Sequence, residues 1–226
     1  MRVIDLTMPL RPHWRWEVSV ETVRDFGPGQ PFRVSELRSN VHALTHVDAQ
    51  LHVLPDAPSI DQVPLSHLAG PASLIDLSSK GPCEAITAED LERNGPHVQN
   101  GDIVLLRTCW DQKYSFESHE YWTQACYVSE SACEWLFDCS PSAVGYDFPQ
   151  DPALRGLGSH TGESSTRGLQ IEGFTTHRLL LARGIYSIEY LANLHEISSP
   201  RFYVFALPLR LEGAEAAPAR VVAVEF

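Results

Sequence analysis

The stretch HALTHVDAQLH, from His42 to His52, restricts the fold of this chain more than any other feature of its sequence. In an extended strand, His42 and His46 would lie about 13 Å apart at roughly 3.3 Å per residue, a long reach for two imidazoles that share an ion. In a helix these histidines lie one turn apart, but Asp48 then points away from them. A strand that breaks into a tight turn near Ala43 and Leu44 and then continues extended brings all three side chains to one side. The stretch therefore indicates a metal site built on such a turn, or a polar loop whose histidines occur by chance.

His52 is the fourth member of this stretch, and its spacing alone leaves two roles open. It could be another metal ligand, or a base that lies just outside the ligand set. An ion that already holds two imidazoles and a carboxylate needs an open position for water, and hydrolysis also needs a group that titrates near neutral pH. This chemistry favours the role of acid and base for His52.

The length and charge of the chain narrow its class. With 226 residues it can build one sizeable core, although two small domains are an alternative. Its formal net charge of -12 argues against a nucleic-acid partner and against an anionic membrane surface, because neither would attract an acidic protein. We therefore expect a small-molecule substrate.

The sequence also indicates a cytoplasmic protein. The N-terminal segment has no basic start followed by a long apolar run, and no window approaches the roughly 20 apolar residues of a membrane span. The five cysteines are odd in number and form no C-x-x-C pair, which is typical of a reducing compartment. We interpret them as small packing residues.

Strand patterns outnumber helix patterns along the chain. A helix is predicted over 86–95, with Thr87 as its N-cap and Gly95 after its last turn, and another follows Ser129. A further helical pattern spans 175–184, and residues 59–70 offer at most a short helix. Apolar or alternating runs predict strands at 2–9, 13–20, 32–37, 73–78, 101–110, 143–148, 185–191, 201–211 and 219–226. The sequence shows neither an internal repeat nor a strong domain boundary.

Two further segments are candidates for contact with a ligand or a partner. Trp14 and Trp16 alternate with polar residues in the predicted ribbon 13–20, and such aromatic residues more often serve a core or an interface than a substrate. Residues 149–170 are rich in Gly, Ser and Pro, so this long connection is either a site-forming loop or mobile. His160 and Glu163 within it would join a site only if the loop folds inward.

The histidine stretch resembles the signature of the cyclase family of metal-dependent hydrolases, to which bacterial kynurenine formamidase and isatin hydrolase belong. The family pattern is H-x-G-T-H-x-D-x-P-x-H, and this chain matches it at His42, Thr45, His46, Asp48 and His52. A second block, HRLLLARGIYSIEYLANL, is similar to a later family block in which a glutamate follows a histidine by twelve residues. The opening VIDLTMPL, the segment YDFPQD and the closing strands also resemble the family, so the similarity spans nearly the whole chain.

The resemblance implies a fold, a cofactor and an assembly. The fold would be a single α/β domain over residues 1–226, of the swivelling β/β/α type, with a mixed β-sheet core and a few short helices. The cofactor would be one or two divalent ions, Zn²⁺ or Mn²⁺, and the assembly a homodimer or homotetramer. The positions that match family metal ligands are His42, His46, Asp48, His177 and Glu189. The position of His52 matches the family's catalytic histidine, and Trp14 or Trp16 could stack on an aromatic substrate.

The departures from the family pattern concern the pocket. The family glycine is Leu44, so the tight turn must form without glycine's freedom at positive φ. The family proline is Gln50, and a common serine is replaced by Gln150. We expect these changes to alter the walls of the pocket more than its metal.

The sequence therefore predicts a metal-dependent hydrolase of a carbon–nitrogen bond outside peptides. N-formylkynurenine, from tryptophan catabolism, is the first substrate to consider and an isatin-like lactam is the second. The alternatives are a non-catalytic protein that keeps the metal motif, and a cyclase, dehydratase or lactonase that acts on an oxygen-rich substrate.

Overall fold

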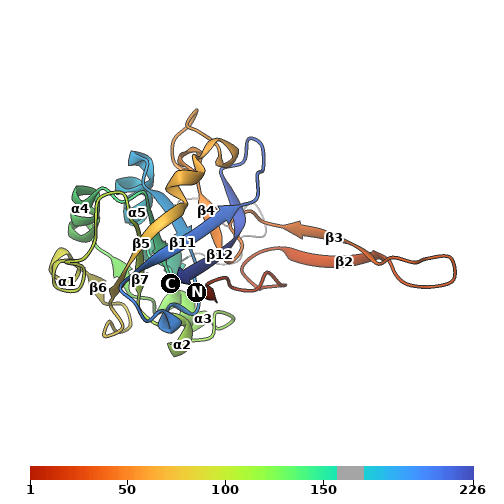
Figure 1. Ribbon diagram of the computed structural model, residues 1–226, viewed down its shortest axis with the longest axis horizontal. Coiled ribbons are helices and arrows are strands. Elements are labelled where there is room, and N and C mark those ends of the chain that lie inside the picture. Colours follow the sequence, from red (N-terminus) through yellow and green to blue (C-terminus); the bar gives the residue numbers. More distant parts are fainter. Residues whose placement is uncertain (157–170) are drawn as a thin grey trace.

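An eight-stranded mixed β-sheet forms the centre of the computed structural model, which describes residues 1–156 and 171–226 (Figure 1). Its strands are β1 (Arg2–Asp5), β4 (His46–Asp48), β5 (Ala69–Asp76), β7 (Ile103–Arg107), β9 (Ala143–Tyr146), β10 (Tyr186–Glu189), β11 (Arg201–Pro208) and β12 (Ala216–Glu225). They follow the order β1-β12-β11-β5-β7-β9-β10-β4. The mixed sheet confirms the predicted fold class.

The sheet closes into a barrel-like shape through the short strand β4. This strand pairs with β10 on one side and with the first residues of the long strand β12 on the other, both antiparallel. Asp48 lies opposite Ser187 in one pairing and opposite Ala216 in the other. The strands β5, β7, β9 and β10 run parallel to one another. The closure places the middle of the histidine stretch between two strands from the last fifth of the chain.

Short helices lie beside the sheet, mainly on the left and below it in Figure 1. They are α1 (Ala88–Asn94), α2 (Trp110–Lys113), α3 (His119–Thr123), α4 (Glu130–Cys139) and α5 (Thr175–Leu179). Thr87 caps α1 in a capping box with Asp90, and Ser129 caps α4, as the sequence predicts. The helices α2 and α3 were not predicted, because four or five residues give too short a periodic pattern.

The other short elements are single turns of 3₁₀-helix and one small pair of strands. The turns span Gln50–His52, Ile60–Gln62, Leu65–His67, Pro152–Gly156, Ile171–Gly173, Leu181–Arg183 and Leu194–Glu196, and β6 (Ala85–Ile86) pairs with β8 (Tyr127–Val128). The turns at 60–67 stand where the sequence predicts at most a short helix.

The core has two parts, and the sheet separates them. Along β7, Val104 and Leu106 contribute to the part that also holds Trp110. Ile103 and Leu105 contribute to the part inside the closed sheet. Because both faces of β7 are buried, its sequence is a continuous apolar run.

A two-stranded arm extends away from the rest of the chain (Figure 1, right). It consists of β2 (Val18–Arg24) and β3 (Val34–Ser39). The strand predicted from residue 13 begins only at Val18, and Trp16 is 2% exposed within the body of the protein. The exposed ribbon therefore carries neither tryptophan.

Residues 157–170, with His160 and Glu163, lie outside the described residues. Among the helices that the structure describes, none has both the length and the apolar character needed to cross a membrane.

Candidate metal centre

The turn that the histidine stretch requires is present at Leu44. This residue has φ 57° in the left-handed region, and its side chain is fully buried. The next residue anchors the turn, because the Thr45 hydroxyl donates to the Tyr190 carbonyl at 2.6 Å and accepts from the Met8 amide at 2.8 Å. The chain therefore makes this turn with a buried leucine, at the position where the family pattern has glycine.

The turn brings three predicted ligands to one point. The Nδ1 atom of His42 lies 3.2 Å from Nε2 of His46 and 3.0 Å from Oδ1 of Asp48. The Nε2 atom of His46 lies 3.1 Å from the same Asp48 oxygen. The three donor atoms are therefore mutual neighbours, in an arrangement that one small cation could occupy.

The two predicted ligands from the later block lie beside this point. Glu189 on β10 is paired with His46 on β4, and its Oε2 atom is 3.8 Å from the Nε2 atom of His46. His177 on α5 places its Nε2 atom 3.7 Å from Oδ2 of Asp48 and 3.5 Å from Oε1 of Glu189. All five predicted ligands thus belong to one cluster.

Three residues that sequence reasoning missed as contacts of this cluster hold its members. Oδ2 of Asp151 accepts a hydrogen bond from Nδ1 of His177 at 2.6 Å, and Glu215 lies with Oε1 3.3 Å from Nε2 of His42. The Gln150 amide donates to Glu189 Oε1. Gln150 was expected to alter the walls of the pocket more than the metal, whereas it contacts a predicted ligand. Gln150 and Asp151 are visible as polar residues in the YDFPQD segment, but the ligands that these two residues and Glu215 contact are remote in the sequence.

The electrostatics of the cluster suit a cation. Burial lowers the pKa of His42, but the adjacent Asp48 outweighs this and raises that pKa to about 10. Burial also lowers the pKa of His177, but the hydrogen bond to Asp151 outweighs this effect and raises that pKa to about 9. Burial raises the pKa of Glu189. For Asp48, burial is outweighed by His46 and His42, which hold its pKa well below the usual value. Without an ion, protons supply the positive charge that these carboxylates need.

The residues present fit a divalent ion. Both oxygens of Asp48 are buried, and the nearest charged groups of Oδ1 are the imidazoles of His42 and His46. Two compact groups of ligand atoms include this carboxylate: His42 with Asp48 and His52, and His46 with Asp48 and Glu189. A buried carboxylate is costly unless a positive charge neutralises it, and a divalent ion between these ligand atoms would supply that charge.

His52 stands at the exposed side of the cluster, on the 3₁₀ turn Gln50–His52. Its ring centroid is 4.3 Å from that of His42 and 5.3 Å from that of His177. Desolvation among these rings lowers the pKa of His52 to about 4, against the opposing effect of Asp48. Gln50 joins this turn to the segment after α5, because its amide donates to the Ala182 carbonyl at 3.3 Å. The position permits either contact with an ion or proton transfer.

The two tryptophans lie at different depths. Trp16 packs against Trp122 and Tyr190, with ring centroids 5.0 and 5.6 Å away. Trp14 donates to the Glu117 carbonyl at 3.0 Å and packs against His119. Stacking of either tryptophan on a substrate stays a prediction, and for Trp16 it would require a buried side chain to become accessible.

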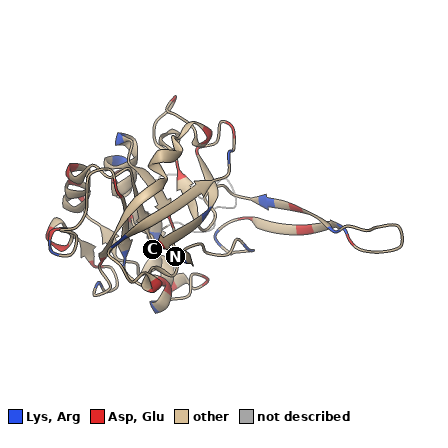
Figure 2. Cartoon of the chain, in the orientation of Figure 1, with Lys and Arg blue, Asp and Glu red and all other residues tan. Residues whose placement is uncertain are grey.

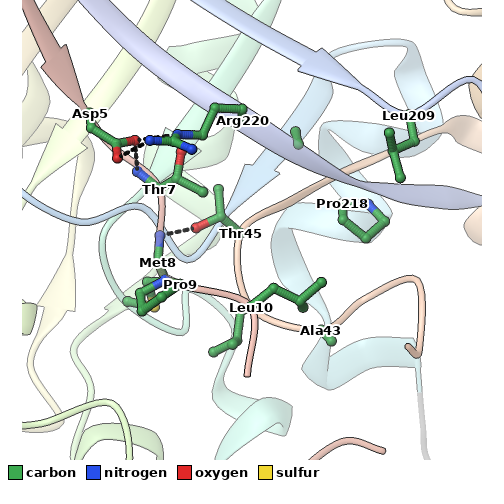
Figure 3. A pocket seen from close by; sticks show the side chains of 12 residues that line it. Asp5, Thr7, Met8, Pro9, Leu10, Ala43, Thr45, Leu209, Pro218 and Arg220 are labelled. Carbon is green, nitrogen blue, oxygen red and sulfur yellow. Dashed lines mark hydrogen bonds and ion pairs between the residues drawn. The ribbon is translucent and has the colours of Figure 1, made fainter. Parts of the chain in front are cut away.

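A pocket of about 330 Å³ lies beside the turn (Figure 3). Leu44 and Thr45 line it together with Met8, Leu209 and the ion pair of Asp5 with Arg220. None of the predicted ligands lines this pocket, so it is separate from the candidate metal centre.

The closed mixed sheet and its buried histidine–carboxylate cluster are those of an α/β metal-dependent hydrolase. A family model described as "Putative cyclase" matches residues 4–150. The chain belongs to this cyclase family, as the sequence motifs predict.

Relatives and solved structures agree over nearly the full length. Kynurenine formamidase from Bordetella petrii is 30% identical over 96% of this chain and 89% of its own. The structure of a "potential metal-dependent hydrolase with cyclase activity" is 29% identical with a TM-score of 0.72, and covers 98% of this chain and 96% of its own. Isatin hydrolase A from Ralstonia solanacearum has a TM-score of 0.81 at 23% identity, covers 99% and 92%, and supports the fold. The protein is therefore an enzyme of the hydrolase class.

Proposed function

We propose that this protein hydrolyses a carbon–nitrogen bond outside peptides, in a formamide or a cyclic amide, with a divalent ion at the cluster. The observation that carries the proposal is the convergence of His42 Nδ1, His46 Nε2 and Asp48 Oδ1 within 3.0 to 3.2 Å of one another. The relationship to kynurenine formamidase supports the reaction class and makes N-formylkynurenine the first substrate to test. An isatin-like lactam is the second.

The residues divide the work of holding an ion and moving a proton. His42, His46 and Asp48 would hold a first ion, and Asp48, His177 and Glu189 a second where two bind. Zn²⁺ and Mn²⁺ are the candidates, because both accept imidazole and carboxylate ligands. When bound, such an ion supplies Lewis-acid chemistry and makes water a stronger acid.

His52 would act as the general base and then as the general acid. Its imidazole lies at the exposed side of the cluster, where the neutral ring would accept a proton from the attacking water. It would return that proton to the departing nitrogen when the carbon–nitrogen bond breaks. An aryl amine leaves more readily than an alkyl amine, which favours formanilide-like substrates.

We further propose that the protein forms a dimer, or a tetramer of dimers, through the arm β2–β3. Phe26 and Phe32 at its tip are each 70% exposed, and Val20 and Leu37 are more than half exposed. An isolated two-stranded hairpin is at best marginally stable in water, so burial against a second copy would stabilise it. Charges of both signs lie along the arm (Figure 2). Glu21 and Glu36 are paired across its two strands, and two like charges in such a pair destabilise an isolated ribbon.

The free cysteines support a reducing, cytoplasmic setting.

The test of the function combines metal analysis with a substrate panel. The purified protein is analysed for bound metals and is then assayed with N-formylkynurenine, isatin and a lactone. Bound zinc or manganese together with turnover of the formamide or the lactam supports the proposal. Turnover of the lactone alone would show that the enzyme hydrolyses a carbon–oxygen bond instead. A metal-free protein that hydrolyses the formamide would refute the metal site.

A further inference from the structure

The three histidines of the cluster do not present the same ring nitrogen to it. His46 and His177 face the cluster with Nε2, whereas His42 faces it with Nδ1. In each ring the other nitrogen has a protein partner. His46 Nδ1 donates to the Leu44 carbonyl at 2.7 Å, and His177 Nδ1 donates to Asp151 at 2.6 Å. The partner of His42 Nε2 is Glu215, at 3.3 Å.

These partners differ in how firmly they are held. The Leu44 carbonyl belongs to the buried turn, and the fully buried Asp151 also accepts from the amide and the hydroxyl of Thr176, both at 2.8 Å. The Glu215 side chain is 41% exposed and lies at the rim of the cluster. His42 is also the more exposed imidazole, at 21% against 1% for His46. The orientation of His42 therefore depends most on a side chain that a substitution can change without disturbing the core.

The backbone of Glu215 is fixed by the same strand pairing that fixes the ligands. Its carbonyl accepts from the Ala49 amide at 2.9 Å, and the next residue, Ala216, pairs with Asp48. The side chain of Glu215 is therefore attached to the backbone one residue before Ala216, which pairs with Asp48.

We propose that Glu215 is a positioning residue, which holds the His42 ring with its proton on Nε2 and its free nitrogen, Nδ1, toward the ion. The inference rests on the metal site proposed above. A carboxylate that accepts from the outer nitrogen of a ligating histidine fixes both the tautomer and the ring plane, and the loss of such a partner typically weakens metal binding about 10- to 100-fold. A ring without this partner can present Nε2 instead, or rotate away from the cluster.

Metal affinity and the identity of the ligating nitrogen test the role of Glu215 directly. Zinc affinity is measured by competition with a chelator for the wild type, Glu215→Leu and Glu215→Gln. The leucine variant removes the acceptor and should bind zinc about 10- to 100-fold more weakly. The glutamine variant keeps a carbonyl acceptor and should lie between the two. Glu212→Leu, which removes the same charge from an exposed site in the same turn, is the matched control and should bind as the wild type does.

Cadmium-113 NMR with ¹⁵N-labelled histidine then reports which nitrogen binds the ion. In the wild type, one histidine should couple to cadmium through Nδ1 and the others through Nε2. The Nδ1 coupling should disappear or weaken in Glu215→Leu and persist in Glu215→Gln. Equal zinc affinities for wild type and Glu215→Leu, or an unchanged Nδ1 coupling in that variant, would overturn the role of Glu215 alone. A wild type that binds neither metal would overturn the metal site and this inference with it.

Discussion

Replacing Leu44 by glycine, the residue of the family pattern, tests whether the buried turn is strained. Leu44 has φ 57°, a conformation that costs a non-glycine residue roughly 1–2 kcal/mol. Glycine would relieve this strain. It would also remove a side chain that is 0% exposed, and truncation of a buried leucine to alanine alone costs about 2–5 kcal/mol. The greater freedom of glycine in the unfolded chain adds about 0.5–1 kcal/mol to the loss.

The burial term is the larger one, so we expect Leu44→Gly to destabilise the metal-free protein by about 2–4 kcal/mol. For a chain of this size that corresponds to a decrease in Tm of roughly 5–15 °C. The truncated side chain would also enlarge the neighbouring pocket, which Leu44 lines.

Leu44→Ala is the matched control, because it removes nearly the same side chain and keeps the strain. At ordinary backbone positions alanine is more stable than glycine, but here glycine should be more stable than alanine by about 1 kcal/mol. Both variants are unfolded with denaturant in the presence of a chelator, so that metal binding does not contribute. An alanine variant more stable than the glycine variant would refute the strained turn, and a glycine variant as stable as wild type would refute the burial argument.

The other predictions concern the metal, the base and the assembly. The His46→Ala variant should contain no bound divalent metal, as measured by elemental analysis. Its Tm should also be lower, since an ion that binds only the native state stabilises that state. Unchanged metal content would exclude His46 as a ligand. His52→Ala should keep its metal while turnover falls about 10²- to 10⁴-fold; loss of metal would make His52 a ligand. The metal-free protein should lose stability as pH rises toward 9–10, because the pKa values of His42 and His177 are raised to about 10 and about 9. Their protonation stabilises the fold fully below about 6.5, the unfolded value, and this contribution disappears above the folded values. The increase in Tm on adding zinc should therefore grow between pH 6.5 and 9, and a constant increase would contradict this. Light scattering should show a dimer or tetramer at micromolar concentration, and deletion of the arm tip, residues 24–33, should shift it toward monomer; a monomeric wild type would reject the assembly.

Much of the fold could be predicted from the sequence because the signals are local. Apolar runs such as that of β7 and caps such as Thr87 depend on neighbours a few residues away. The tight turn near Leu44 followed from the spacing of His42, His46 and Asp48, which no regular element satisfies. The arm was misread in part, because alternation in residues 13–20 does not reveal that Trp16 turns into the body of its own chain.

The partners of the ligands could not be predicted in this way. Glu215 reaches His42 only because β12 pairs with β4, a contact across more than 160 residues of sequence. Gln150 and Asp151 were visible as polar residues, but their partners, Glu189 on β10 and His177 on α5, lie 39 and 26 residues away in the sequence. Long-range pairing of this kind leaves no periodic signal in a single sequence.

The pairing of β4 with β12 also has a consequence for synthesis of the protein. The N-terminal strand of the cluster, β4, is synthesised long before the strand that closes the sheet beside it, because β12 begins only at Ala216. One edge of β4 therefore stays unpaired until β12 has been synthesised, and contacts of such high sequence separation form slowly. Metal uptake during translation should accordingly follow the synthesis of β12, and a nascent chain stopped before Glu215 should bind the ion far more weakly than a chain that includes β12.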